Sequence, residues 1–105
     1  MNIVIRTDAS NHIGSGHIMR CLVLAFALKE QGHQVSFASR PQQGDLIDFV
    51  RNKGFTVKEL ATPVNWLTPQ SSADYAAWLQ VPWQDDAENL IQQFNNVDLI
   101  IVDHY

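Results

Sequence analysis

The chain has 105 residues, which is enough for one domain with a buried hydrophobic core. Its formal net charge is −4 and its 7 basic residues are scattered, which argues against a nucleic-acid-binding domain. No apolar run approaches the ~20 residues that span a membrane, and no charged-then-apolar leader opens the chain, so we expect a cytoplasmic protein that binds neither nucleic acid nor membrane.

The first predicted elements are a strand, a loop and a helix. Residues 2–7 contain three consecutive β-branched residues, which is typical of a parallel strand buried on both faces. Residues 8–15 form a polar loop with glycine. Residues 16–31 carry a wide apolar stripe that predicts a helix packed on a sheet; it comprises Ile18, Met19, Leu22, Val23, Ala25, Phe26 and Leu28. Cys21 lies within this pattern, so we predict a buried free thiol, which suits a reducing compartment.

The rest of the chain alternates between strands and helices. The predicted strands are 34–39, 55–60 and 97–102, and the predicted helices are 45–53 and 85–94. Between them, residues 61–83 hold three prolines and three tryptophans with no clear period, although 74–79 could form a helical turn. The tryptophans of this segment either form an aromatic wall for a sugar or pack the segment onto the domain, and packing is the simpler interpretation.

This alternation predicts an α/β fold: a Rossmann-like parallel sheet with helices on both faces and right-handed crossovers. The simplest strand order is 3-2-1-4, which reverses between the first and the last strand. Ligands bind at such a reversal, beyond the carboxyl ends of the strands. We therefore expect residues 8–17 and 103–105 to border one crevice. Because the chain stops inside that crevice, we interpret it as a fragment, residues 1–105 of a larger domain.

A glycine loop marks one side of this crevice. Gly14-Ser15-Gly16 precedes the first helix, where unpaired N–H groups and the helix dipole favour a phosphate or sugar. The third glycine of a dinucleotide fingerprint and the Lys-Ser/Thr of a P-loop are both missing. A tight strand-to-helix turn is an equally good interpretation.

His17 occupies the first turn of the predicted helix. The helix dipole disfavours imidazolium there, and a neutral imidazole is what a general base needs. A nearby carboxylate, Asp8 or Asp103, would orient it. The simpler alternatives are a solvated histidine, and an Asp103 that only caps its loop.

Two arginines flank the loop, and His12 and His17 lie on either side of its junction with the helix. Arg6 and Arg20 could bind an anionic ligand, but an ion pair of Arg6 with Asp8 or Asp103 is the favoured interpretation. His12 and His17 are five residues apart, which is not a helical ligand pair, and no cysteine cluster accompanies them. We therefore expect no metal site.

Together these motifs resemble the UDP-sugar hydrolases of pseudaminic acid biosynthesis. The resemblance rests on Arg6-x-Asp8, Ile13-Gly14-x-Gly16-His17-x-x-Arg20-Cys21-Leu22-x-Leu24-Ala25, Val35-x-Phe37, Arg40, Trp78-Leu79, Trp83-x-x-Asp86-Ala87 and Val102-Asp103-His104-Tyr105. It implies a GT-B-type glycosyltransferase-like fold of two Rossmann-like domains with the active site between them. This chain would cover about half of the N-terminal domain, and the absent C-terminal domain, which supplies most UDP contacts, would complete the site.

The resemblance also implies roles for individual residues. His17 would activate the water that attacks the anomeric carbon, releasing UDP and a 2,4-diacetamido-2,4,6-trideoxyhexose without a metal or cofactor. The implied catalytic residues are His17, Tyr105 and Asp8, and the implied substrate-binding residues are Gly14, Ser15, Gly16, Arg20, Asp103 and His104. Two alternatives stay open: a glycosyltransferase whose histidine deprotonates an acceptor hydroxyl, and an inactive half of a two-chain protein. We expect the 105-residue chain alone to be inactive.

Overall fold

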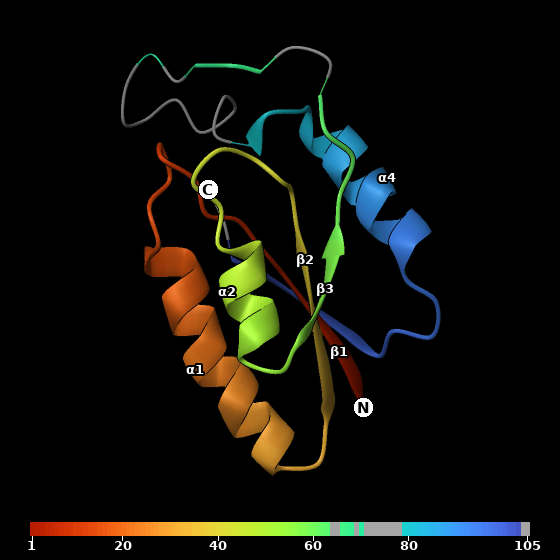
Figure 1. The fold of residues 1–105 in the computed structure, drawn as a ribbon. Coiled ribbons are helices and arrows are strands. Elements are labelled where there is room, and N and C mark those ends of the chain that lie inside the picture. The colour runs from red at the N-terminus through yellow and green to blue at the C-terminus, as the bar shows by residue number, and fades with distance from the viewer. Residues whose placement is uncertain (64–65, 69, 71–78, 104–105) are drawn as a thin grey trace.

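The computed structural model describes residues 1–63, 66–68, 70 and 79–103. It contains a four-stranded parallel sheet of order β3-β2-β1-β4, which confirms the predicted α/β class and strand order. The elements in Figure 1 are β1 (Asn2–Thr7), α1 (Gly16–Glu30), β2 (Gln34–Ser39), α2 (Ile47–Asn52), β3 (Thr56–Glu59), α4 (Trp83–Gln93) and β4 (Leu99–Asp103). Residues 74–78 of the predicted helical turn lie outside the described residues.

The predicted boundaries are correct for β1 and β2 and shift by one or two residues elsewhere. α4 begins at Trp83 because the extended Pro82 precedes it and the Pro82 carbonyl accepts the Asp86 N–H at 3.1 Å. β4 begins only at Leu99, since Val97 packs against the sheet face that α4 covers. Tertiary packing, which a local pattern does not record, sets these ends.

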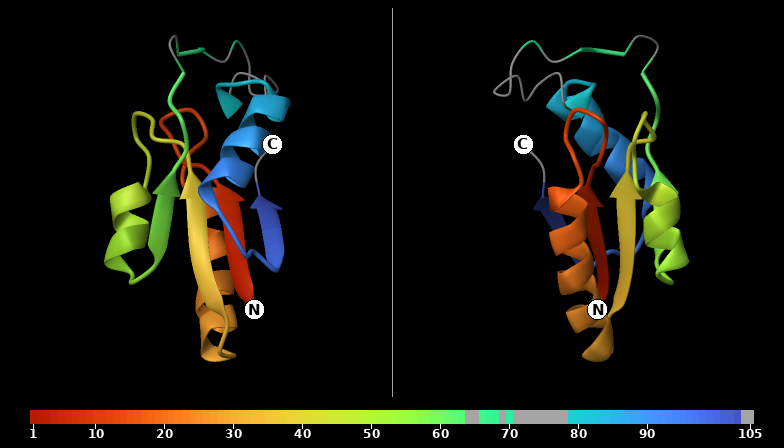
Figure 2. Two further views of the ribbon diagram at one scale, coloured as in Figure 1. Left: turned by 90° about the vertical axis from the view of Figure 1, so that its right-hand side faces the viewer. Right: turned by 60° about the vertical axis from the view of Figure 1, so that its left-hand side comes forward.

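Helices cover both faces of the sheet, as predicted. Figures 1 and 2 show α1 and α2 on one face and α4 on the other. Because side chains alternate along a strand, β1 and β2 contribute to both cores. The core under α1 and α2 includes Ile5, Phe37 and Val57 from the strands and Ile18, Cys21, Leu22, Ala25, Ile47 and Val50 from the helices. The core under α4 consists of Val4, Ala38, Leu60 and Leu90, with Phe94 and Val97 packed against it.

The buried stripe of α1 is narrower than the sequence predicts. Ile18, Cys21, Leu22 and Ala25 are buried at helical spacing, and Cys21 is the predicted free thiol. The predicted wide stripe is wrong for three of its members, because Met19, Val23 and Phe26 are exposed. A sheet surface contacts only one side of a helix, so these apolar residues lie at the edge of the core or outside it, and Phe26 still packs edge-on against Phe55.

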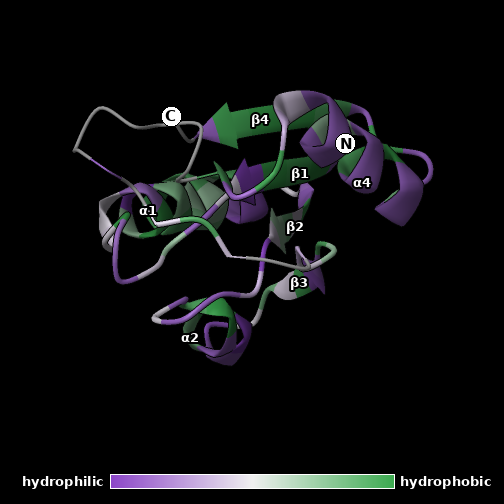
Figure 3. Cartoon of the chain, turned by 90° about the horizontal axis from the view of Figure 1, so that it is seen from above, coloured by the Kyte–Doolittle hydropathy of each residue, from purple (hydrophilic) through white to green (hydrophobic). Residues whose placement is uncertain are grey.

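β4 is the edge strand beside β1 and its side chains are among the most apolar in the sheet (Figure 3). Leu99, Ile100 and Val102 nevertheless remain exposed, to 43%, 44% and 57%. β4 therefore presents apolar side chains that the described residues do not cover. No helix in the described part of the chain is long and apolar enough to cross a membrane.

A buried charge cluster joins β1, β2 and α4. Arg6 forms a bidentate pair with Asp8, at 2.6 and 2.9 Å, and a second bidentate pair with Asp86, at 2.6 and 3.0 Å. Arg40 donates to Asp86 at 2.5 Å, and its backbone N–H donates to Asp8 at 2.9 Å. The favoured ion pair of Arg6 is thus confirmed with Asp8, and its second partner is Asp86 on α4.

The pairing keeps the cluster charged although all four side chains are buried. Burial by itself raises the pKa of Asp86, but hydrogen bonds and charge from Arg6 and Arg40 outweigh burial and hold that pKa below its ordinary value. Burial also lowers the pKa of Arg6, yet Asp8 and Asp86 raise it above the usual range. Asp86 and Arg6 therefore stay charged inside the protein because of the oppositely charged groups around them.

Arg40 extends the cluster to the segment that follows β3. Its guanidinium donates to the carbonyl of Ala61, where this segment begins, and to the Asn89 side chain at 3.3 Å. Since Arg40 also contacts Asp86 on α4, one side chain holds both ends of residues 61–82.

We predict that Asp86→Asn destabilises the protein by about 3–5 kcal/mol, because it leaves Arg6 and Arg40 buried with one counter-charge fewer. Urea unfolding measures the loss, and Asp85→Asn, at an exposed position one residue earlier, is the matched control. Because the folded-state pKa of Asp86 is depressed, its stabilisation is present above the unfolded pKa of about 3.9 and is lost as pH falls below it. The acid-induced loss of stability should therefore be smaller in the variant, and equal stability of the two variants would contradict this role.

Candidate functional site

The loop between β1 and α1 is held by its own hydrogen bonds. The Ser10 hydroxyl accepts the N–H groups of His12 and Ile13 at 3.2 and 3.0 Å. The Gly14 N–H donates to the Ser10 carbonyl at 2.8 Å. Gly14 has a φ of +81°, a conformation that L side chains rarely adopt, so the turn requires glycine at this position.

The start of α1 is open to an anion or a sugar. Ser15 is the N-cap residue, but among the described residues its side chain caps no N–H group, and the first turn contains no acidic residue. A Cβ placed on Gly16 would meet no atom within 4 Å. The first-turn N–H groups carry the partial positive charge of the helix dipole and therefore suit a negatively charged ligand.

His17 contacts a carboxylate from the far side of the strand-order reversal. Its Nδ1 atom lies 2.8 Å from Oδ1 of Asp103, the last residue of β4. The imidazole is buried, and the Asp103 side chain is about one-fifth exposed. The predicted proximity of the 8–17 region to residue 103 is confirmed.

Two further α1 side chains donate hydrogen bonds to the Asp103 carboxylate. Arg20 donates through Nε to Oδ2 of Asp103 at 2.6 Å and also contacts Oδ1. The Cys21 thiol donates to Oδ2 at 3.3 Å. Residues 17, 20 and 21 lie on one helix face because their spacings are three and four, so all three side chains reach the same group.

Strand alternation explains why Asp103, rather than Asp8, contacts His17. Asp103 is in register with Thr7 of β1, on the face that α1 covers. Asp8 lies two residues after Arg6, and both side chains meet Asp86 or its partners on the α4 face. The structure therefore places Asp8 in the buried cluster, where it also accepts from Ser39 at 3.3 Å.

The charges around Asp103 fix its protonation state. Hydrogen bonding from Arg20, aided by His17 and Cys21, holds the pKa of Asp103 well below its ordinary value despite partial burial. Burial, with a contribution from Asp103, raises the pKa of the Cys21 thiol to about 12. At neutral pH the site therefore contains a carboxylate and a protonated thiol, and Cys21 is no nucleophile.

The imidazole of His17 has two partners at the same nitrogen. Nδ1 lies 2.8 Å from Oδ1 of Asp103, which can only accept, and 2.9 Å from Nη2 of Arg20, which can only donate. In the tautomer with its proton on Nδ1, the imidazole would donate to Asp103 and carry its lone pair on Nε2.

The remaining predicted site residues have mixed outcomes. Gly14, Ser15 and Gly16 shape the loop and the helix start, and Arg20 binds Asp103. His104 and Tyr105 lie outside the described residues, as does Trp78. Within the described part of the chain, no group of three or more His, Cys, Asp or Glu residues is placed to hold a metal ion.

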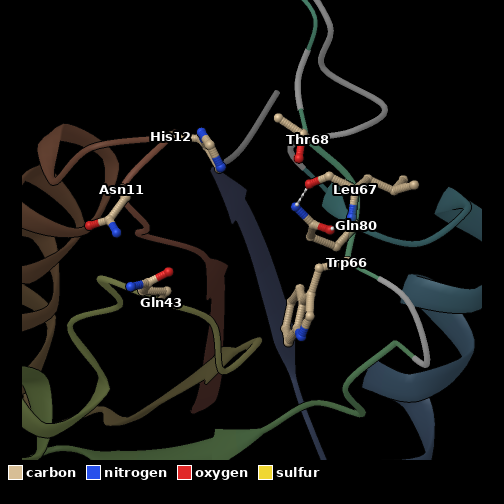
Figure 4. Close-up of a pocket in the computed structure, with 7 residues that line it drawn as sticks. All are labelled: Asn11, His12, Gln43, Trp66, Leu67, Thr68 and Gln80. Atoms are coloured by element: carbon tan, nitrogen blue, oxygen red, sulfur yellow. Dashed lines mark hydrogen bonds between the residues drawn. The ribbon is translucent and has the colours of Figure 1, made fainter.

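A cavity of about 340 Å³ opens at the carboxyl ends of the strands (Figure 4). It is lined by Asn11, His12, Gln43, Trp66, Leu67, Thr68 and Gln80. No sequence motif marks Asn11, Gln43 or Gln80 as site residues, because they come from separate segments of the chain. Only the tryptophans of residues 61–83 gave a signal for this cavity.

Comparison with known proteins confirms the resemblance seen in the motifs. The chain is 35% identical over all of its 105 residues to the UDP-2,4-diacetamido-2,4,6-trideoxy-beta-L-altropyranose hydrolase of Campylobacter jejuni subsp. jejuni serotype O:2. The match covers 28% of the length of that relative. No family model matches the chain.

We predict that Asp103→Ala changes the tautomer of His17. The substitution removes the acceptor at Nδ1, whereas the Arg20 guanidinium can donate but not accept, so the ring proton should move to Nε2. The ¹⁵N chemical shifts of the imidazole report the change. Asp98→Ala, which removes an exposed aspartate just before β4 begins, is the control and should leave the tautomer unchanged. Identical His17 shifts in the wild type and Asp103→Ala would contradict the assignment.

Proposed function

We propose that the protein to which this chain belongs is a UDP-sugar hydrolase of pseudaminic acid biosynthesis that acts in the cytoplasm. Its substrate is UDP-2,4-diacetamido-2,4,6-trideoxy-β-L-altropyranose. The observation that carries the proposal is the contact between His17 and Asp103 at the head of α1. Similarity over the whole chain to a hydrolase of that name supports the substrate.

His17 is the general base of the proposed reaction. Nε2 removes a proton from water as the water oxygen bonds to the anomeric carbon, and the bond from that carbon to the phosphate oxygen breaks. UDP leaves with the electron pair of the broken bond. The Asp103 carboxylate stabilises the imidazolium that forms and holds the ring in position.

The loop and the helix start bind the substrate in this proposal. Gly14, Ser15 and Gly16 let the sugar and its phosphates approach the first-turn N–H groups of α1, which stabilise the charge on the departing UDP. Arg20 keeps Asp103 ionised. Asp8 acts through the buried cluster as a positioning residue.

Two residues enter the proposal through the resemblance. The resemblance implies that Tyr105 belongs to the same site as His17 and that His104 binds the substrate. Both follow Asp103 directly, so they continue the chain from the carboxylate that orients the base. No metal or cofactor takes part.

A second domain completes the proposed site. The chain spans 28% of the length of the hydrolase it matches, and β4 carries exposed apolar side chains at the sheet edge. An uncovered edge strand of this composition favours further strands or a covering domain. We therefore interpret residues 1–105 as part of the N-terminal Rossmann-like domain of a GT-B-type protein whose C-terminal domain supplies most UDP contacts.

A GT-B glycosyltransferase is the alternative function, because a base oriented by Asp103 would equally remove a proton from an acceptor hydroxyl. The two functions differ in what accepts the sugar. Release of UDP and free sugar without any added acceptor supports the hydrolase, whereas UDP release that requires an acceptor supports the transferase.

We predict that His17→Asn lowers kcat for UDP release by about 100- to 10,000-fold, the range that a general base contributes. UDP binding by calorimetry should be nearly unchanged, which shows that the variant is folded. His33→Asn is the control, because His33 precedes β2 at the opposite end of the sheet. Turnover by His17→Asn at the rate of the control would refute the role of this histidine.

We also predict that Gly16→Ala impairs substrate binding, whereas Gly14→Ala lowers the stability of the fold. Gly16 has neither a left-handed φ nor a neighbour within 4 Å, so Gly16→Ala should preserve stability but raise KM by obstructing the substrate. Gly14 has a φ of +81°, so Gly14→Ala should cost about 1 kcal/mol or more in urea unfolding. A normal KM in Gly16→Ala would contradict close approach of the substrate to the helix start.

A further inference from the structure

The cavity of about 340 Å³ lies between two walls that come from different segments of the chain (Figure 4). The first wall consists of Asn11 and His12 from the β1–α1 loop and Gln43 from the segment after β2. The second consists of Trp66, Leu67, Thr68 and Gln80 from the segment between β3 and α4. The volume is within the range of small-molecule sites.

Backbone contacts hold the first wall in place. The Asn11 N–H donates to the Gln43 carbonyl at 3.0 Å, which ties the two segments together. Gly44 packs so closely that a Cβ on it would overlap with the side chain of Asn11. The two carboxamides of this wall therefore project from a fixed backbone.

Hydrogen bonds between the Gln80 side chain and the Leu67 backbone hold the second wall. The Gln80 carboxamide accepts the Leu67 N–H at 2.7 Å and donates to the Leu67 carbonyl at 3.0 Å, so it pairs with the chain as a neighbouring strand would. Gln80 is buried. The adjacent Trp66 side chain stays half exposed and lines the cavity.

The lining chemistry suits a hydrogen-bonding ligand with an apolar face. The described lining includes the carboxamides of Asn11, Gln43 and Gln80, a hydroxyl, the His12 imidazole and the Trp66 indole. Carboxamides donate and accept hydrogen bonds, and the flat indole of Trp66 packs well on the C–H face of a sugar ring.

We propose that this cavity binds the sugar ring of the substrate through its acetamido groups, while the diphosphate lies at the start of α1. The proposal rests on the proposed function, since the acetamido groups are those of the UDP-sugar inferred above. Asn11 and His12 of the cavity lie in the β1–α1 loop, which leads directly into the start of α1 at Gly16. This arrangement orients the nucleotide sugar by separating its neutral and charged parts.

Binding of N-acetyl-D-glucosamine to the full-length protein tests the cavity directly. In NMR titrations, this sugar should shift the Trp66 indole N–H and the Gln43 carboxamide resonances, and D-glucose should shift them less because it has no acetamido group. Trp66→Ala should weaken the binding about 3- to 10-fold. Trp83→Ala, which removes an exposed indole at the start of α4, should leave it unchanged. Absence of shifts at Trp66 and Gln43, or equal effects of the two variants, would overturn the proposal.

Kinetics separates this proposal from the proposed function. Trp66→Ala should raise KM for the UDP-diacetamido-sugar about 3- to 10-fold with unchanged inhibition by UDP. If the wild type hydrolyses the substrate and Trp66→Ala has normal KM, the sugar site is wrong and the hydrolase stands. If the wild type hydrolyses no UDP-sugar while the titration still shows binding at Trp66, the hydrolase is wrong and the cavity remains a sugar site.

Discussion

The pairing of Arg6 and Arg40 with Asp8 and Asp86 is the constraint on which the other features depend. Removing these charges from water costs several kcal/mol for each ion, and only complete pairing with good hydrogen-bond geometry offsets that cost. The cluster therefore requires the carboxyl ends of β1 and β2 to meet the first turn of α4. Because Arg40 also binds the Ala61 carbonyl, the same cluster determines where residues 61–82 leave and rejoin the sheet.

The candidate site uses the opposite face of the same strand ends. Asp103 reaches α1 because β4 pairs with β1 in a register that aligns it with Thr7. One carboxylate then contacts an imidazole, a guanidinium and a thiol, all from one face of α1. Strand alternation thus separates Asp8 from Asp103: Asp8 belongs to the buried cluster, and Asp103 contacts the His17 imidazole.

The proposed site binds the charged and the uncharged part of its ligand at two different places: the diphosphate at the start of α1 and the sugar ring in the cavity. The helix start favours negative charge, whereas the described lining of the cavity beyond Asn11 consists of carboxamides, a hydroxyl, an imidazole, an indole and a leucine side chain. A nucleotide sugar has the matching asymmetry, with a charged diphosphate and an uncharged ring.

Local patterns in the sequence determined the order of strands and helices, the strand order of the sheet, and the meeting of His17 with residue 103. Apolar periodicity and the preference for right-handed crossovers leave few alternatives for such an alternating chain. Only the tertiary structure decided which aspartate orients His17, how much of the α1 stripe is buried, and that Arg40 and Asp86 form a buried pair. Those outcomes depend on strand register and on contacts between residues far apart in the chain, such as Asp86, which lies 80 positions from Arg6. Burial and charge pairing at that separation exist only after the sheet has assembled.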